Sequence, residues 1–420
     1  MRFRLDSSLP DDAGWTTPPT TAQRVLLGDA CGAVLRDGTG AIQRRWDDPL
    51  AGLAWLDQQR RRGGRWVGFL AYELGYLLEP ASAPAGWDVS AGLLYAWGWV
   101  PNLPKRLHAR PQMPAGAGIA GNAISSFRST FTRPAYLEAV ARCIDYIAAG
   151  DVFQVNLSQR LAIPFRGAPA ALYASLLATA PAAYGALLEL EDRAIISNSP
   201  ELFLRVTAEG RIITRPIKGT RPRGAGDDSD AALAAELLAS AKDAAELNMI
   251  VDLERNDLGR VCEIGSVRVS EPRTIETHPS VHHGVATVEG RLRADVGLVE
   301  LLRATFPGGS VTGAPKIRAM QIIAELEPAP RGAYCGAIGH LDADGSITLN
   351  VAIRTMTLGD GALHIPVGGG IVADSDPAAE HEETLVKARA MLRAAAMAER
   401  DGAAYGVQAP ADPAVSWPDV

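Results

Sequence analysis

Lysine is scarce in this chain of 420 residues. Only five of its 41 basic residues are lysines, so the other 36 are arginines; the lysines are Lys105, Lys218, Lys242, Lys316 and Lys387. A guanidinium keeps its proton in proteins, whereas an ammonium can lose one, so a retained lysine suggests a need for a compact charge or a removable proton. Four of the five lie beyond residue 210, in segments rich in glycine, proline and carboxylates. Chance is the alternative explanation, because those segments form a large part of the chain.

Cysteines and long apolar runs are also scarce. The four cysteines lie far apart without metal-ligand spacing, so we expect buried, reduced thiols in a cytoplasmic protein. No apolar run approaches the roughly 18 residues of a membrane helix. The opening residues MRFRLDSSLPDD lack the apolar region of a secretory signal. The net charge of -7 and the absence of a basic tract argue against a nucleic-acid partner.

Short strands joined by hairpin turns dominate the sequence pattern. Runs such as AYGALLELE, AIISNSPELFLRV and RIITRPI are bounded by turn residues, and DVFQVNLSQRLAIPF alternates with a period of two. Helical spacing follows Thr132 and returns in a long run from about Pro377 to Arg400. Runs of strands with helices between them predict an α+β fold class with antiparallel sheets.

The composition predicts four segments along the chain. Residues 1–107 are expected to form an N-terminal region, and 108–125 a linker rich in alanine, glycine and proline. Residues 126–402 are expected to form one larger domain, and 403–420 a disordered tail.

The stretch from Arg215 to Arg260 begins with a lysine in a turn. It reads RPIKGTRPRG, so Lys218 is followed directly by Gly219 and Thr220. Such a turn can present backbone N–H groups and a hydroxyl to an anion.

The same stretch ends in a helix that Ser240 can cap. Asp243 and Glu246 lie three residues apart on it and therefore share one face. On the closing helix Glu380, Glu383 and Lys387 share a face in the same way. Two such acidic pairs can meet across a Mg²⁺ site, since this ion prefers few carboxylates plus substrate oxygens and water. The alternative is a solvated helix face with a Glu383–Lys387 ion pair.

Other residues suit an anionic ligand. Arg354 lies on an otherwise apolar strand and would be costly to bury unless it met a carboxylate. The triple glycine from Gly368 to Gly370 would let a ligand approach the backbone, although plain turn geometry explains it equally well. Cys31 has no His-x-Glu partner later in the chain, so we expect ammonia, if used, to come from elsewhere.

Several segments occur together and in order, and they resemble one family. They are PIKGTRPRG, KDAAELNMIVDLERNDLGRV, FPGGSVTGAPKIRAMQIIAELEP, GAYCGAIG, NVAIRT, GGGIVADSDP and AEHEETLVKA. Over about residues 126–400 the chain resembles the chorismate-utilising enzymes. The resemblance implies two antiparallel sheets packed as a two-layer sandwich surrounded by helices. It also implies that chorismate is the substrate and Mg²⁺ the cofactor.

The resemblance also implies roles for individual residues. Glu246 and Glu383 match the metal ligands, with Asp243 and Glu380 as outer carboxylates. Gly219, Thr220 and His283 match positions around the ring carboxylate of chorismate. The grip on the enolpyruvyl carboxylate matches Tyr334, Arg354, Lys387, Gly368 and Gly370, with Thr312 in the adjoining loop. Glu201 in SPELF matches the general acid that helps the C4 hydroxyl leave.

Two positions separate members of the family. Enzymes that add water carry a lysine base where this chain has Gln154, and anthranilate synthases typically read PIAGT where this chain reads PIKGT. Lys218 therefore resembles the catalytic lysine of aminodeoxychorismate synthase component I. The expected reaction joins chorismate to ammonia from a separate glutaminase, giving 4-amino-4-deoxychorismate. The alternatives are anthranilate synthase component I and an inactive subunit that binds chorismate or tryptophan.

Overall fold

Two antiparallel sheets form the centre of the protein. The computed structural model describes residues 1–8, 14–84, 92–101, 127–279 and 281–404. Every strand pair within them is antiparallel. The predicted α+β class is confirmed.

Sheet A contains nine described strands in the order β17-β9-β21-β20-β11-β10-β1-β2, with β8 beside β9. Their bounds are β1 Arg2–Asp6, β2 Thr17–Thr21, β8 Arg128–Ser129, β9 Gln154–Pro164, β10 Tyr184–Glu189, β11 Arg193–Ser199, β17 Gly313–Ala314, β20 Thr355–Gly359 and β21 Ala362–Ile371.

Sheet B contains twelve described strands in the order β14-β16-β13-β12-β19-β18-β6-β7-β3-β4-β5, with β15 beside β16. Their bounds are β3 Arg24–Asp29, β4 Gly32–Asp37, β5 Ile42–Trp46, β6 Arg65–Leu70, β7 Tyr95–Val100, β12 Leu202–Val206, β13 Arg211–Arg215, β14 Ile217–Pro222, β15 Arg268–Thr277, β16 Val281–Arg291, β18 Ala337–Asp342 and β19 Ile347–Val351.

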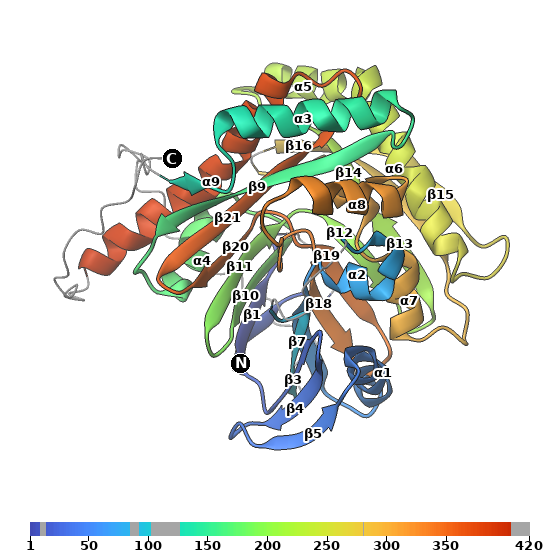
Figure 1. Cartoon of the computed structure of the whole chain (residues 1–420), viewed down its shortest axis with the longest axis vertical. Coiled ribbons are helices and arrows are strands. Elements are labelled where there is room, and N and C mark those ends of the chain that lie inside the picture. The colour runs from blue at the N-terminus through green and yellow to red at the C-terminus, as the bar shows by residue number, and fades with distance from the viewer. Residues whose placement is uncertain (9–13, 85–91, 102–126, 280, 405–420) are drawn as a thin grey trace.

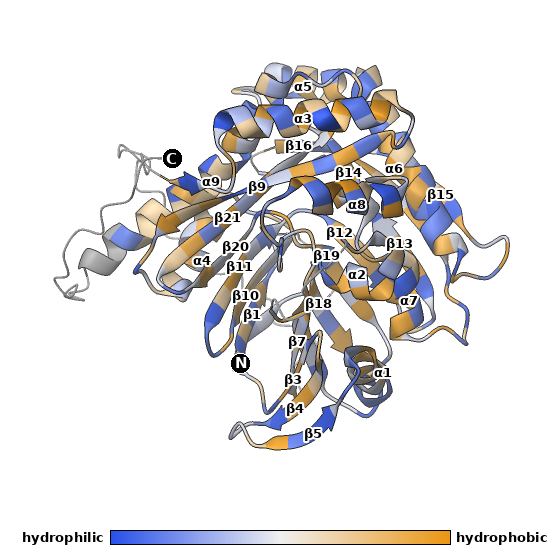
Figure 2. Ribbon diagram, viewed as in Figure 1, coloured by the Kyte–Doolittle hydropathy of each residue, from blue (hydrophilic) through white to orange (hydrophobic). Residues whose placement is uncertain are grey.

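The described helices lie around these sheets (Figure 1). They are α1 Pro49–Arg60, α2 Leu74–Leu78, α3 Arg133–Ala148, α4 Pro169–Thr179, α5 Asp227–Ala239, α6 Ala241–Gly259, α7 Leu298–Thr305, α8 Lys316–Leu326 and α9 Pro377–Ala404. Short 3-10 turns occur at Pro80–Ser82 and Gly309–Val311. Hydrophilic and hydrophobic bands alternate along most helices, as expected where one face covers a sheet (Figure 2). No described helix is long and apolar enough to cross a membrane.

Three apolar clusters hold the layers together. The first lies between the sheets and joins Leu5 and Ala186 of sheet A to Val67 and Ile338 of sheet B. The second joins the other face of sheet A to α4 and α9. The third joins sheet B and β9 to α1, α2, α3, α6, α7 and α8. The sandwich surrounded by helices that the resemblance implied is therefore present.

The N-terminal strands belong to both sheets. β1 pairs with β10 in sheet A, and β6 pairs with β18 in sheet B. The expected boundary near residue 107 consequently does not separate one sheet from another. The expected linker at 108–125 and almost all of the expected tail at 403–420 lie outside the described residues.

Local predictions agree with the structure in most places. Thr132 caps α3 by accepting a hydrogen bond from the N–H of Ala135, and the closing helix α9 begins at Pro377 as expected. The acidic, alanine-rich run at 227–239 is helix α5, which the weak hydrophobic periodicity of that run did not indicate. The prediction of buried thiols is wrong for Cys31, because the two-residue turn between β3 and β4 exposes it.

A buried arginine joins several elements near the middle of the molecule. The Arg331 guanidinium pairs with Glu327 at 2.6 Å, and their side chains are 2% and 6% exposed. It also donates to the carbonyls of Val311 at 2.8 Å and Asn156 at 2.6 Å, and it stacks on the ring of Tyr72. One side chain thus connects α8, the 309–311 turn, strand β9 and the segment before α2.

We predict that Arg331→Ala lowers the free energy of unfolding by about 3–5 kcal/mol, because the buried Glu327 carboxylate would lose its cation and keep only the hydrogen bonds from Ser158. Denaturant unfolding followed by circular dichroism measures this change. Arg142→Ala is the control, because its ion pair with Glu325 is half exposed and its loss should leave the midpoint nearly unchanged. Equal effects of the two substitutions would contradict the assigned role of Arg331.

Candidate functional site

Strand β14 places three of the predicted residues next to each other. Lys218, Gly219 and Thr220 lie on it, and Gly219 has a φ of +82°, which a side chain would strain. Thr220 is in register with His283 on β16, and its Oγ1 lies 2.9 Å from Nδ1 of that ring. A Cβ on Gly219 would lie 2.8 Å from Cγ of Asp243. The predicted carboxylate cradle therefore contacts helix α6.

The amine of Lys218 lies among charged groups from other elements. Burial lowers the pKa of Lys218, while the carboxylates of Glu246 and Glu201 act in the opposite direction and the ammonium of Lys387 acts with burial. An amine with a lowered pKa can lose its proton near neutral pH and then act as a nucleophile or a base.

Glu201 is a buried acid directly before β12. Its side chain is 4% exposed, and Oε1 has no hydrogen-bond partner among the described residues. Burial raises the pKa of Glu201 to about 7, with Ser310 and Lys218 acting in the opposite direction. A carboxyl group of this kind can hold a proton at neutral pH and donate it in a reaction.

Helix α6 begins as the sequence predicted. Ser240 caps it by accepting a hydrogen bond from the N–H of Asp243, and Arg221 of β14 binds the Asp243 carboxylate at 3.2 Å. Glu246 follows one turn later and is partly exposed. The Asp243 carboxylate is thus held by the strand that carries Lys218.

Helix α9 carries the second acidic pair. The Ser375 hydroxyl donates to Glu380 at 2.7 Å, and Lys387 lies 2.7 Å from Glu383. The Lys387 ammonium also donates to the carbonyl of Gly368 at 2.9 Å. The Glu383–Lys387 ion pair, which was the alternative for this helix, is therefore present. Lys387 also connects the two glutamates of α9 to strand β21.

The two acidic pairs converge near Lys218. The pKa of Lys218 responds to Glu246 on α6 and to Glu383 on α9. Burial opposes ionisation of Glu383, yet Lys387, Lys242 and Lys218 outweigh it and lower the pKa of that carboxyl. No three His, Cys, Asp or Glu side chains in the described chain stand together as a finished metal cage. Two carboxylates suffice where substrate oxygens and water complete the shell of Mg²⁺, so the donor set fits this ion.

Arg354 carries a guanidinium that forms no ion pair with the part of the chain that the structure describes. The φ of Arg354 is +49°, and burial lowers the pKa of its guanidinium. Burial and, next, the charge of Arg354 lower the pKa of His283 to about 3. This effect indicates that the guanidinium lies near the imidazole. The imidazole is consequently neutral at physiological pH, and the guanidinium is available to an anionic ligand.

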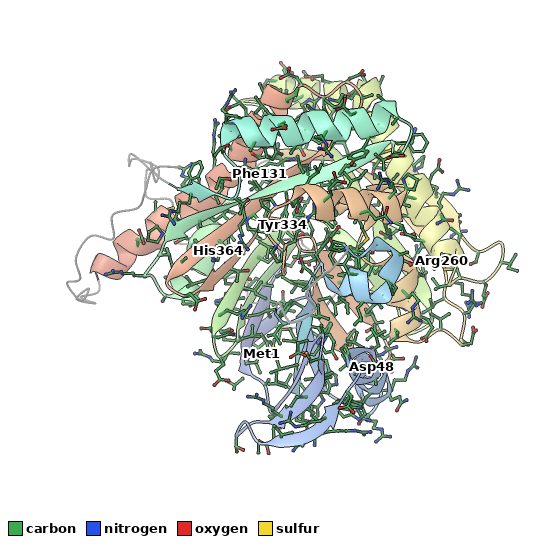
Figure 3. The ribbon with its side chains drawn as sticks, viewed as in Figure 1. Met1, Asp48, Phe131, Arg260, Tyr334 and His364 are labelled. Atoms are coloured by element: carbon green, nitrogen blue, oxygen red, sulfur yellow. The ribbon has the colours of Figure 1, made fainter. Side chains whose placement is uncertain are left out.

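Tyr334 and Thr312 are not joined to this cluster by a described contact. Tyr334 is buried near the centre of the molecule (Figure 3), and burial raises the pKa of its hydroxyl well above the usual range. The Thr312 hydroxyl is buried and donates to the carbonyl of Gly308 at 3.0 Å. Thr312 thus stabilises the 309–311 turn, and only its oxygen lone pair remains for a ligand.

The middle glycine of the triple glycine is the one that faces the acidic pair. A Cβ on Gly369 would lie 3.2 Å from Oε2 of Glu380 and 3.8 Å from Oε1 of Glu383. The neighbouring Gly370 faces Gln154 instead, because a Cβ on Gly370 would lie 3.0 Å from Cδ of Gln154. The family resemblance pointed to the outer two glycines, Gly368 and Gly370, and strand alternation alone does not say which face of β21 meets α9.

Gln154 holds an uncommitted amide. The residue is fully buried, and neither amide atom has a hydrogen-bond partner among the described residues. A buried polar group without a partner is costly, so this amide suits a ligand or water. From the sequence, this position on β9 was of interest only because enzymes that add water carry a lysine there.

Solved enzyme structures share the sandwich fold of this protein. The structure of anthranilate synthase component I from Streptococcus pneumoniae has a TM-score of 0.74 and 30% identity, covering 93% of this chain and 92% of that one. The menaquinone-specific isochorismate synthase of Escherichia coli has the same fold, with a TM-score of 0.65 at 19% identity and 94% of each chain covered.

The sequence match then names the family. Residues 15–393 match the chorismate binding enzymes, so the chain belongs to that family. Anthranilate synthase component 1 of Pseudomonas aeruginosa is 49% identical over 275 residues, 66% of this chain and 56% of that protein. Aminodeoxychorismate synthase component 1 of Klebsiella aerogenes is 41% identical over 343 residues, 78% of this chain and 76% of that protein. The matched part thus spans little more than half of the Pseudomonas relative.

We predict that Gly219→Ala lowers kcat/KM for chorismate roughly 100-fold, because the methyl group would displace Asp243 and the carboxylate cradle by a fraction of an ångström or more. Steady-state chorismate consumption measures the loss. Gly265→Ala is a matched control, because Gly265 has a φ of +80° with no atom within 4 Å of its Cβ position. If both variants lost activity equally, backbone strain alone would explain the effect.

Proposed function

We propose that this chain is the chorismate-converting component of an aminodeoxychorismate synthase, which makes 4-amino-4-deoxychorismate from chorismate and ammonia. The observation that carries the proposal is Lys218 near Glu201: burial lowers the pKa of the amine and raises the pKa of the carboxyl to about 7. A nucleophilic amine must lose a proton, and a general acid must hold one. The two shifts favour those protonation states.

The proposed reaction has two displacements. The neutral amine of Lys218 attacks C2, the ring double bonds shift, and the C4–O bond breaks while Glu201 gives its proton to the departing hydroxyl, which leaves as water. Ammonia then bonds to C4, the double bonds shift back, and Lys218 leaves C2 as a neutral amine. The ammonium formed at C4 returns one proton to Glu201, so both residues are ready for another cycle.

The other predicted residues bind the carboxylates of chorismate in this proposal. Those at the ring carboxylate are Gly219, Thr220 and His283. Those at the enolpyruvyl carboxylate are Tyr334, Arg354, Lys387, Gly368 and Gly370, with Thr312 in the adjoining loop. A substrate carboxylate would supply the anion that Arg354 lacks in the described structure.

Glu246 and Glu383 would hold Mg²⁺, and Asp243 and Glu380 would lie behind them. When bound, the ion would neutralise and orient the ring carboxylate. The arrangement of the two pairs around Lys218 supports this assignment.

Ammonia would come from a separate glutaminase. The relatives in Pseudomonas aeruginosa and Klebsiella aerogenes are both named as a component 1, which implies a second component in those enzymes. Cys31 also lacks the sequence context of a glutaminase nucleophile.

Anthranilate synthase component I is the second candidate function. It is supported by the 49% identity to the Pseudomonas aeruginosa protein of that name. Lys218 favours the first candidate, because anthranilate synthases typically have alanine at this place in PIAGT. A subunit that only binds chorismate or tryptophan would need no nucleophile.

We predict that the protein, mixed with chorismate, Mg²⁺ and ammonium, forms 4-amino-4-deoxychorismate. Mass spectrometry of the product, together with fluorescence, distinguishes the candidates. Release of fluorescent anthranilate without any added lyase would overturn the first candidate in favour of the second. An unchanged chorismate signal at every ammonium concentration would contradict both.

We predict that Lys218→Ala and Lys218→Arg each lower chorismate turnover at least about 100-fold, since neither side chain can form the bond to C2. The arginine variant is the sharper test, because it keeps the positive charge but not the removable proton. Rapid-quench kinetics with product detection measure the loss. Normal turnover of Lys218→Arg would remove the covalent role and leave only an electrostatic one.

A further inference from the structure

The N-terminal region binds a turn that lies far from it in the sequence, at residues 331–336. Glu73, directly before α2, accepts a hydrogen bond of 2.7 Å from the N–H of Arg331 and one of 3.0 Å from the N–H of Gly332. The N–H of Tyr72 donates in return to the carbonyl of Gly332 at 2.8 Å. Two successive N–H groups directed at one carboxylate form an anion-binding turn. The 331–336 turn therefore depends on an acid that lies 258 residues earlier.

The carboxylate of Glu73 binds the main chain of the turn in the described structure. Burial raises the pKa of Glu73, and the N–H groups of Arg331 and Gly332 act in the opposite direction. The guanidinium of Arg331 lies nearby, but it pairs with Glu327 and donates to two carbonyls. Glu73 is thus placed to fix a backbone conformation.

The other end of the 331–336 turn has a strained backbone and contacts a second strained segment. Cys335 has a φ of +59° and Arg354 has a φ of +49°, a region that residues with a side chain rarely adopt. The N–H of Cys335 donates to the carbonyl of Ala352 at 3.0 Å, and the N–H of Ala352 donates to the carbonyl of Gly336 at 2.9 Å. Such strain persists only where the surroundings fix it, and it is frequent at ligand sites. The turn therefore helps to fix the segment that carries Arg354.

The opposite side of that segment has its own contacts. The N–H of Val351 donates to the carbonyl of Glu201 at 3.0 Å, and the N–H of Asn198 donates to the carbonyl of Arg354 at 3.1 Å. The pairing of β12 with β19 lies directly beside these bonds. Glu201 belongs wholly to this side, whereas the main chain of Arg354 depends on both sides. A displaced turn should consequently misplace the guanidinium and leave Glu201 where it is.

We propose that Glu73 is a positioning residue that holds the 331–336 turn, and through it Arg354, in the conformation that binds the enolpyruvyl carboxylate of chorismate. The same turn carries Tyr334, which the proposed function assigns to the same carboxylate (Figure 3). The inference rests on that proposed function. It gives the N-terminal region a part in substrate affinity, although Glu73 acts only through the turn.

The first test compares KM with kcat in Glu73→Gln, measured as total chorismate loss so that the identity of the product does not matter. The amide oxygen of glutamine accepts one of the two N–H groups, but its NH2 group opposes the other, so the turn shifts. The enolpyruvyl carboxylate takes no part in the proposed bond changes, so its contacts affect the ground state and the transition state alike. We expect KM to rise about 10-fold while kcat changes less than about twofold.

Two further variants separate the bonds of Glu73 from its charge. Glu73→Asp keeps the carboxylate on a shorter side chain and should recover part of the lost affinity. The matched control is Glu325→Gln on α8, which removes the same charge shortly before the turn. Glu325 pairs with Arg142 and is 42% exposed, so this substitution should leave KM and kcat in place. An equal rise of KM in Glu325→Gln would make the loss of charge the cause and overturn the proposal.

A double-mutant cycle asks whether Glu73 acts through Arg354. Arg354→Gln should raise KM by itself, and adding Glu73→Gln should raise it little further, because the affected contact is already lost. Fully additive effects would mean that Glu73 acts on another part of the site, and the proposal fails. An unchanged KM in Glu73→Gln, together with a lower unfolding midpoint, would leave Glu73 only a structural role and overturn the proposal as well.

The second test needs no substrate. Hydrogen–deuterium exchange followed by mass spectrometry reports on the N–H groups of the 331–336 turn and of Ala352. We expect peptides that span 331–336 and 350–354 to exchange faster in Glu73→Gln and at the original rate in Glu325→Gln. Unchanged exchange in Glu73→Gln would contradict the proposal. If exchange rises but the unsubstituted protein neither binds nor consumes chorismate, the proposed function fails and the control of the turn by Glu73 stands.

Discussion

The charge on Lys218 is the constraint on which the rest of the site depends. Burial disfavours the ammonium form, while carboxylates from α6, from α9 and from the start of β12 favour it. The amine can therefore serve as a nucleophile only if these opposing effects nearly balance. That balance requires elements that are distant in sequence to reach their places together, so the site exists only once both sheets have formed.

The sheet topology provides this assembly. Strand β14 lies at one end of sheet B beside β16, and β21 lies beside β9 near one end of sheet A. Helices α5 and α6 follow the first of these strands in the chain, and α9 follows the second, so each acidic pair lies on a helix that comes shortly after a strand of the site. The N-terminal strands complete both sheets from their other ends, and Arg331 connects β9 to the turn that carries Ser310. Contacts far from Lys218 in the sequence therefore help to hold the elements that surround its amine.

Part of the site could be predicted from spacing, because helical periodicity is a local property. Ser240 as a cap and the pairs Asp243–Glu246 and Glu380–Glu383 follow from residues three apart. The convergence of the pairs was an inference from family motifs, since periodicity does not say which helices meet. The facing of Gly369 depends on which side of β21 meets α9, and the contact of Glu73 with the 331–336 turn depends on where the N-terminal region meets the segment after α8. The insertion of β1 and β6 into the sheets is likewise non-local and was not visible in composition.

The absence of a direct ion pair is what makes the proposed chemistry reasonable. A salt bridge between Lys218 and Glu201 would hold the amine protonated and the carboxyl ionised, which is the wrong state for both residues. Among the described residues Lys218 forms no ion pair with any carboxylate, and Oε1 of Glu201 has no hydrogen-bond partner. The amine of Lys218 and the carboxyl of Glu201 therefore influence each other's pKa electrostatically, without a direct hydrogen bond between them. An arginine at 218 could not take part in this arrangement, which is a physical reason for a lysine to persist there in a chain that uses arginine almost everywhere else.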